Sequence, residues 1–221
     1  MKQPLLTTDF LDRAVDLFGD DIGIVAEDGT EFAYNEVGER VDRLSNALRD
    51  RGIGKGDRVA LLSKNSHYFI ETLYATTQLG ALFVPLNFRL QSEEYNYLVS
   101  DCNPDVFITD DEHAGKVTYL QDSSDVDEWI AYNAADAEGE WDDYETVLEE
   151  ASTVSPNRPD ISEDDEATIL YTSGTTGDPK GVVHTHRSQH YHAMIHAHHV
   201  EFEDDDTLLW TSPMFHINGW G

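Results

Sequence analysis

Apolar residues recur at helical spacing near the start of the chain. Val37, Val41, Leu44 and Leu48 share one face of a helix, and charged residues stand between them. A glycine-rich stretch that begins at Gly52 provides a stop signal. The pattern therefore predicts an amphipathic helix that ends near Gly52.

The rest of the chain alternates short apolar runs with further helical segments. Expected strands are 58–63, 81–85, 106–109, 167–171 and 207–211, with another apolar run at 182–184. Expected helices are 67–79, 92–99, 144–151 and 187–200, and Ser92 is the expected N-cap of its helix. Alternation of this kind is typical of an α/β fold whose largely parallel sheets are flanked by helices.

Periodicity weakens between residues 111 and 166, where acidic residues accumulate. We interpret this region as a surface excursion and connector with short strands and the helix at 144–151. The chain is thus divided into a first α/β part at 1–110, an acidic connector at 111–166 and a last part at 167–221.

Net charge is the most unusual bulk property of the chain. Its 221 residues include 44 acidic and 14 basic ones, for a net charge of −30. A phosphate backbone would be repelled, so nucleic acid is excluded as a partner. The apolar periodicity favours a folded protein with an acidic surface over a disordered acidic chain, and the pattern resembles proteins of salt-loving archaea.

Location and redox state follow from features near the start and from the cysteine count. No apolar run reaches the ~20 residues of a membrane span, and acidic residues interrupt any signal-like stretch at the N-terminus. We therefore expect a cytoplasmic protein. Cys102 is the single cysteine, which excludes an internal disulfide and suits a small buried apolar residue.

The segment Thr172–Gly177 combines two glycines with four hydroxyl side chains. Glycines allow close backbone approach to a ligand, hydroxyls can contact phosphate oxygens or a metal, and Lys180 adds a mobile cation. A Walker A loop is disfavoured because Lys180 lies between Pro179 and Gly181, without the Gly-Lys-Ser/Thr sequence. A glycine-rich hairpin without a ligand is the plain structural alternative.

The stretch 169–181, ILYTSGTTGDPKG, resembles the signature of the adenylate-forming superfamily, which includes acyl-CoA synthetases, peptide-synthetase adenylation domains and luciferases. Further landmarks of that family are matched in order at 32–36, 56–59, Asn65 and 80–87, so the resemblance covers nearly the whole chain. Ala33 departs from the Ser or Thr usual there, which removes a helix cap worth about 1 kcal/mol. The resemblance implies that residues 1–221 are an incomplete N-terminal AMP-binding domain of an acyl-CoA synthetase-like fold.

The resemblance also implies a reaction. A fatty or other carboxylic acid attacks the α-phosphate of ATP to give an acyl-adenylate and pyrophosphate, and the thiol of coenzyme A then displaces AMP. The protein must hold the leaving phosphates. By resemblance, the phosphate-binding residues are Thr172, Ser173, Gly174, Thr175, Thr176, Gly177 and Lys180, and the Thr172 hydroxyl contacts Mg²⁺.

The stretch 213–220, PMFHINGW, resembles the family's next motif in the form typical of fatty-acyl-CoA synthetases. The resemblance places His216 beside the acyl-adenylate as a catalytic and substrate-binding residue. Ile217, Asn218 and Gly219 are expected to line the acyl pocket, and Trp220 to gate it. An amino-acid adenylation domain is disfavoured by this motif.

Histidines are frequent between His184 and His199. His186/His190 and His192/His196 are spaced so that each pair could share a helix face and bind zinc. No cysteine or acidic cluster accompanies them in this stretch, so we favour a helix packed behind the phosphate loop with neutral histidines.

Later motifs of the family, its metal-binding acid and its C-terminal domain are not found in the sequence. We therefore expect residues 1–221 alone to be inactive, although the complete protein is expected to be a ligase. The alternative hypothesis is a non-catalytic nucleotide-binding module. The acyl chain length and the oligomeric state stay open, with a homodimer as one option.

Overall fold

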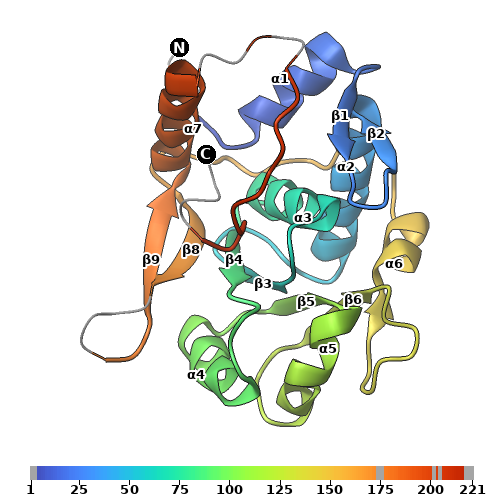
Figure 1. Cartoon of the computed structure of the whole chain (residues 1–221), viewed down its shortest axis with the longest axis vertical. Helices are drawn as coiled ribbons and strands as arrows, with labels where there is room; N and C mark the ends of the chain where they lie inside the picture. The colour runs from blue at the N-terminus through green and yellow to red at the C-terminus, as the bar shows by residue number, and fades with distance from the viewer. Residues whose placement is uncertain (1–3, 173–176, 201–202, 204–205, 217–221) are drawn as a thin grey trace.

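A single seven-stranded sheet forms the centre of the protein (Figure 1). The computed structural model describes residues 4–172, 177–200, 203 and 206–216. In spatial order the strands are β7 (Asp142–Asp143), β6 (Glu128–Tyr132), β5 (Val106–Asp110), β3 (Arg58–Leu62), β4 (Leu82–Leu86), β8 (Glu166–Thr172) and β9 (Lys180–Thr185). All neighbours are parallel except β8 and β9, which are antiparallel. The expected largely parallel α/β fold is confirmed.

Helices cover both faces of this sheet, and a small antiparallel hairpin lies outside it. The hairpin is β1 (Ile22–Val25) with β2 (Glu31–Ala33). The helices are α1 (Asp9–Phe18), α2 (Tyr34–Asp50), α3 (His67–Gln78), α4 (Ser92–Cys102), α5 (Asp111–Val117), α6 (Tyr144–Glu150) and α7 (His186–Val200), with a 3₁₀ turn at Thr118–Asp122. The architecture is therefore a three-layer α/β/α arrangement.

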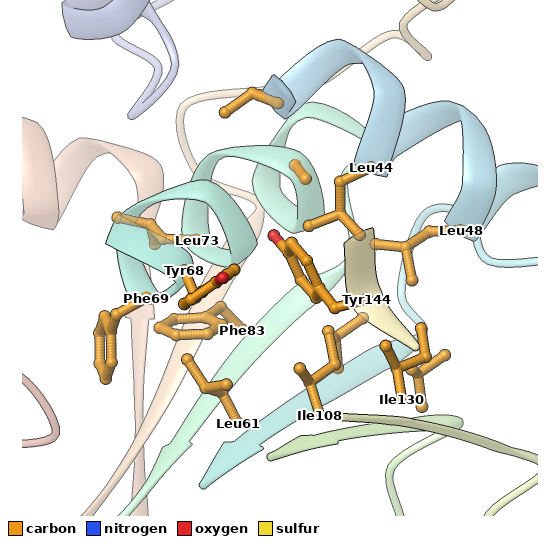
Figure 2. Packing of buried hydrophobic residues seen from close by; sticks show 14 of the residues in the cluster. Leu44, Leu48, Leu61, Tyr68, Phe69, Leu73, Phe83, Ile108, Ile130 and Tyr144 are labelled. Atoms are coloured by element: carbon orange, nitrogen blue, oxygen red, sulfur yellow. The ribbon is translucent and has the colours of Figure 1, made fainter. Parts of the chain in front are cut away.

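Side-chain alternation along the central strands supplies two separate cores. Val59 and Leu61 of β3 pack toward α2, α3 and α6, whereas Ala60 and Leu62 pack toward α4 and α5. Figure 2 shows the first core, where Leu44 and Tyr144 lie close together and Phe69 lies beside Phe83. Central parallel strands are buried on both faces, which explains why their sequences are continuous apolar runs.

The direction in which the chain moves across the sheet reverses at β3. From β3 the chain passes through α3 to β4 on one side, and then through α4 to β5 on the other side of β3. In open α/β sheets, ligands bind outside the carboxyl ends of strands at such a switch point. Segments that follow β3, β4, β5 and β8 all start at this edge.

One charged cluster lies inside the first core. The carboxylate of Glu71 on α3 is fully buried and accepts two hydrogen bonds from the Arg40 guanidinium, at 2.6 and 3.2 Å. Arg40 also contacts Glu145, and the Tyr144 phenol donates to Glu71 at 2.9 Å. Burial opposes ionisation of Glu71 and raises its pKa, so the guanidinium is needed to compensate its charge.

Two expectations from the sequence require correction. The N-cap of α4 is Gln91, because Glu94 reaches back to accept from the Gln91 backbone N–H at 2.8 Å; Ser92 is the first helical residue. Thr207–Thr211 forms no strand, since no described strand lies beside it to supply hydrogen-bond partners. Among the short strands expected between residues 111 and 166, β6 lies inside the central sheet, where its Ile130 and Ala131 are buried.

Other expected elements are confirmed with small shifts of their ends. Helix α2 stops just before Gly52, which has a φ of +94°. Ala33 precedes α2 without a side-chain cap, and its backbone N–H is instead bonded to Glu36 at 2.8 Å. Among the described helices, none combines the length and apolar character that crossing a membrane requires.

Candidate functional site

Strands β8 and β9 flank the glycine- and hydroxyl-rich loop. Thr172, the last residue of β8, lies directly opposite Lys180, the first residue of β9. The loop leaves the carboxyl end of β8, at the edge where the switch point lies. Four of the expected phosphate-binding residues lie outside the described part of the chain, namely Ser173, Gly174, Thr175 and Thr176.

The backbone conformation or the packing explains why glycine occupies two positions of this segment. Gly177 has a φ of +156°, in the range that favours glycine. Gly181 lies across from Tyr171, and a Cβ atom there would come within 2.8 Å of the Ile169 side chain. The signature therefore requires Gly181 for packing within the β8–β9 pair.

Thr172 and Lys180 both face solvent. Within the described residues, Lys180 forms no ion pair, although the net charge of the chain is −30 and most other cations have carboxylate partners. A hydroxyl and an uncompensated ammonium group thus mark the two ends of the loop. This arrangement suits a polyanion.

Helix α4 holds the segment on each side of the loop. The Tyr97 phenol donates to the carbonyl of Pro179 at 3.0 Å, and the Tyr171 phenol donates to the Asp101 carboxylate at 2.7 Å. Tyr97 and Asp101 are four residues apart and so lie on one face of the helix. Burial and the adjacent carboxylate raise the pKa of the Tyr171 phenol, which therefore keeps its proton and acts as the donor.

The segment that leads to His216 returns to the same edge of the sheet. A turn closes where the His216 N–H donates to the carbonyl of Pro213 at 3.1 Å. Met214 and Phe215 are buried, whereas His216 is exposed. Ile217, Asn218, Gly219 and Trp220, expected to line and gate the acyl pocket, lie outside the described residues.

Sequence reasoning missed the residues that hold these two segments. Asn65 lies two residues before the start of α3 and forms hydrogen bonds with both Ser212 and Met214. The sequence marks it only as a landmark of the family. Tyr97 and Asp101 carry no local signal except their helical spacing. Their partners lie 82 and 70 residues away along the chain, so periodicity gives no hint of the contacts.

Two other chemically interesting features have structural explanations. Burial raises the pKa of the Cys102 thiol to about 12, which makes it a poor nucleophile and agrees with the expected role as a buried apolar residue. The rings of His192 and His196 lie with centroids 4.6 Å apart on α7. No group of three or more metal-binding side chains was found among the residues that the structure describes.

The site therefore combines a β8–β9 loop flanked by Thr172 and Lys180 with a second segment ending at His216. Comparison with protein families finds a match to the AMP-binding enzyme family across residues 11–221. The chain belongs to this family.

Relatives of this AMP-binding chain include several CoA ligases. Indoleacetate–CoA ligase of Aromatoleum aromaticum is 33% identical over 86% of this chain and 37% of the relative. The long-chain-fatty-acid–CoA ligase of Mycobacterium tuberculosis is 34% identical over 84% of this chain and 36% of the relative. The chain thus spans little more than a third of the curated relatives it matches.

Solved structures agree with the fold and with this partial coverage. The inhibitor-bound N-terminal domain of FACL13 from Mycobacterium tuberculosis has a TM-score of 0.86 and 32% identity, over 97% of this chain and 52% of that domain. ATP-bound MatB from Rhodopseudomonas palustris has a TM-score of 0.83 and 26% identity, over 98% and 42%. The α/β arrangement of this chain is that of the N-terminal part of acyl-CoA synthetases.

Proposed function

We propose that this AMP-binding chain is the N-terminal part of an AMP-forming acyl-CoA synthetase. The observation that carries the proposal is that Thr172 lies opposite Lys180, which forms no ion pair with the described residues, at the two ends of the glycine-rich loop. In a chain with a net charge of −30, a lysine beside such a loop that has no acidic partner in the described part of the chain is well suited to ATP.

The proposed reaction has two steps. First, a carboxylate oxygen of the acid forms a bond to the α-phosphorus of ATP, and the bond to the bridging oxygen of the pyrophosphate group breaks. Second, the sulfur of coenzyme A bonds to the acyl carbon, AMP leaves with the electron pair, and the thiol proton is released. Lys180 and the loop residues 172–177 stabilise the negative charge on the departing pyrophosphate.

Thr172 is the residue of this chain that we propose as a contact for Mg²⁺. Its hydroxyl ends β8 and faces solvent, so a hydrated ion carried by ATP could reach it. Mg²⁺ would supply charge neutralisation at the phosphates. The ion usually keeps several waters and binds through few protein ligands, so one hydroxyl here is chemically compatible with it.

His216 is proposed to lie beside the acyl-adenylate. It is exposed at the end of a turn whose preceding residues are buried, so its position is constrained while its ring stays accessible. We further propose that Ile217, Asn218 and Gly219 line the acyl pocket and that Trp220 gates it. The substrate class is a fatty or other carboxylic acid, since the named relatives act on acids as different as indoleacetate and long-chain fatty acids.

A panel of aromatic, short-chain and long-chain carboxylic acids tests the proposal. Pyrophosphate release and CoA-thioester formation would be measured with the complete protein at high salt. We also propose that the protein works in a cytoplasm of high salt content. Lys180→Ala should lower kcat/KM for ATP about 100-fold because a phosphate contact is lost. Lys55→Ala is the matched control, since Lys55 pairs with Asp165 away from the loop.

Other outcomes of this assay have defined meanings. ATP binding without pyrophosphate release for any acid would favour the non-catalytic nucleotide-binding module. We propose that residues 1–221 alone are inactive, although they could still bind one of the substrates. Rapid CoA-thioester formation by residues 1–221 alone would contradict this proposal.

A further inference from the structure

Asn65 occupies a distinctive place in the fold. It follows β3 directly after Ser63 and Lys64, and α3 begins two residues later at His67. Because β4 and β5 lie on opposite sides of β3, this position is at the switch point of the sheet. A side chain here can reach whatever covers the carboxyl ends of the central strands.

The side-chain amide of Asn65 bonds to two backbone groups of one distant segment. Its Nδ2 donates to the carbonyl of Ser212 at 2.7 Å, and its Oδ1 accepts from the N–H of Met214 at 2.8 Å. Between those two residues lies Pro213, which has no N–H to offer. The amide therefore engages the carbonyl before the proline and the N–H after it.

This pairing also fixes the orientation of the amide. If the oxygen and nitrogen of Asn65 were exchanged, the oxygen would face the Ser212 carbonyl and the NH₂ group would face the Met214 N–H. Both contacts would then be repulsive. Only a side chain with one donor and one acceptor in this arrangement satisfies the segment.

Packing holds the residues that follow. Met214 is 7% exposed and lies in the first core, and Phe215 is 9% exposed. The Phe215 ring meets Phe88 edge to face at 5.2 Å, and the Arg89 guanidinium lies 5.9 Å from the Phe215 ring centre. The next residue is His216.

Among residues 206–211 before the segment, Trp210 is partly buried against the first core and the others are exposed. Residues 206–211 have no regular structure, and Leu208 and Leu209 are 55% and 82% exposed. The position of the turn at 213–216 consequently depends on the Asn65 contacts, on the two buried side chains and on the partial burial of Trp210. Loss of the amide removes the polar contacts and leaves packing alone.

We propose that Asn65 is a positioning residue, which acts through the 212–216 segment to set the place of His216 for adenylate formation. This proposal rests on the proposed function, because it assigns His216 a role in the reaction. Asn65 itself is not a catalytic residue, since its amide is already engaged by Ser212 and Met214.

Hydrogen exchange tests the contact without any substrate. The Met214 amide should exchange about tenfold faster in Asn65→Ala, because its acceptor is lost. In Asn65→Asp an acceptor for Met214 stays in place while the donor to Ser212 is lost, so a smaller increase is expected. Lys64→Ala, which removes only an exposed ion pair with Glu112, is the matched control and should leave the exchange unchanged.

A double-mutant cycle on the complete protein tests the functional part. Asn65→Ala should lower kcat for pyrophosphate release about 10- to 100-fold, as expected for a misplaced group, with KM for ATP nearly unchanged. Asn65→Ala combined with His216→Ala should be no slower than His216→Ala alone. Effects that multiply would overturn the proposal, as would unchanged exchange at Met214.

The two proposals fail in different ways. If the wild-type protein releases no pyrophosphate with any acid, the proposed function fails and the role of Asn65 in catalysis fails with it, whatever the exchange result. If the wild type is active and Asn65→Ala folds with full kcat, only the positioning role is refuted. Circular dichroism of each variant would show that the fold is retained.

Discussion

The Tyr171 phenol donates a 2.7 Å hydrogen bond to the Asp101 carboxylate, which joins the residue before Thr172 to helix α4. With the Tyr97 contact to Pro179, one helix face holds both ends of the segment that contains the glycine-rich loop. For the proposed binding of ATP, fixed ends of this segment reduce the conformational entropy that binding costs.

Removing these anchors should weaken ATP binding. Asp101→Ala and Tyr97→Phe are each expected to raise KM for ATP about 3- to 10-fold, because a hydrogen bond contributes about 0.5–1.5 kcal/mol. Steady-state kinetics with varied ATP would measure the effect. Asp101→Asn, which keeps an acceptor for Tyr171, should be close to wild type, and equal losses in Asp101→Asn and Asp101→Ala would argue against the hydrogen bond.

Arg40 should be important for stability. Arg40→Ala leaves the fully buried carboxylate of Glu71 without its guanidinium, and we expect unfolding free energy to fall by about 3–5 kcal/mol. Urea denaturation would measure this loss. Arg49→Ala removes only an exposed pair with Asp50 and should cost less than about 1 kcal/mol, so similar losses for both variants would refute the argument.

Acid should destabilise the protein through His186. This side chain is fully buried, its Nδ1 accepts from the Thr7 N–H at 3.2 Å, and burial lowers its pKa to about 4. The nearby carboxylates of Asp165 and Asp9 oppose that shift, while Lys55 adds to it. An unfolded histidine gains its proton near pH 6.5, whereas the folded one stays neutral until about pH 4.

The contribution of neutral His186 to the free energy of unfolding is therefore fully present above about pH 6.5. It is lost as the pH falls toward 4, and the loss reaches about 3 kcal/mol. His186→Gln does not titrate and keeps an acceptor for Thr7. Denaturation curves from pH 7 to 4.5 should consequently show a smaller decline for the variant than for wild type. Parallel declines would mean that His186 does not control this pH dependence.

Salt should stabilise the folded state. With a net charge of −30, repulsion among carboxylates opposes the compact chain, and the screening length falls from about 10 Å at 0.1 M to about 3 Å at 1 M salt. We expect the midpoint of thermal unfolding to rise between 0.1 and 2 M potassium chloride. That the acidic surface is adapted to high salt is a prediction. A midpoint that stays constant or falls with added salt would contradict it.

Strongly periodic segments were predictable from the sequence because local patterns determine them. Helix α2 and strands β3 and β4 lie within a few residues of the expected positions. Short strands were expected in the acidic region, but β6 could not be placed because five residues carry too little pattern, and its pairing with β5 and β7 makes it a strand. Thr207–Thr211 has a strand-like composition, but a strand also needs a neighbour.

The candidate site was predictable only as far as it is local. The glycine-rich loop and the His216 motif are continuous in sequence and could be recognised, although much of both lies outside the described residues. Contacts that support them join distant parts of the chain, as with Asn65 and Met214, which are 149 residues apart. No pattern within a window of sequence reports such a pair.

The identity of the nucleotide product tests the central claim most directly. ATP, a carboxylic acid that supports turnover and coenzyme A would be incubated with the complete protein, and nucleotides would be separated and quantified. The proposed reaction yields AMP and pyrophosphate in equal amounts with the CoA thioester. Formation of ADP and phosphate, or thioester without AMP, would contradict the account.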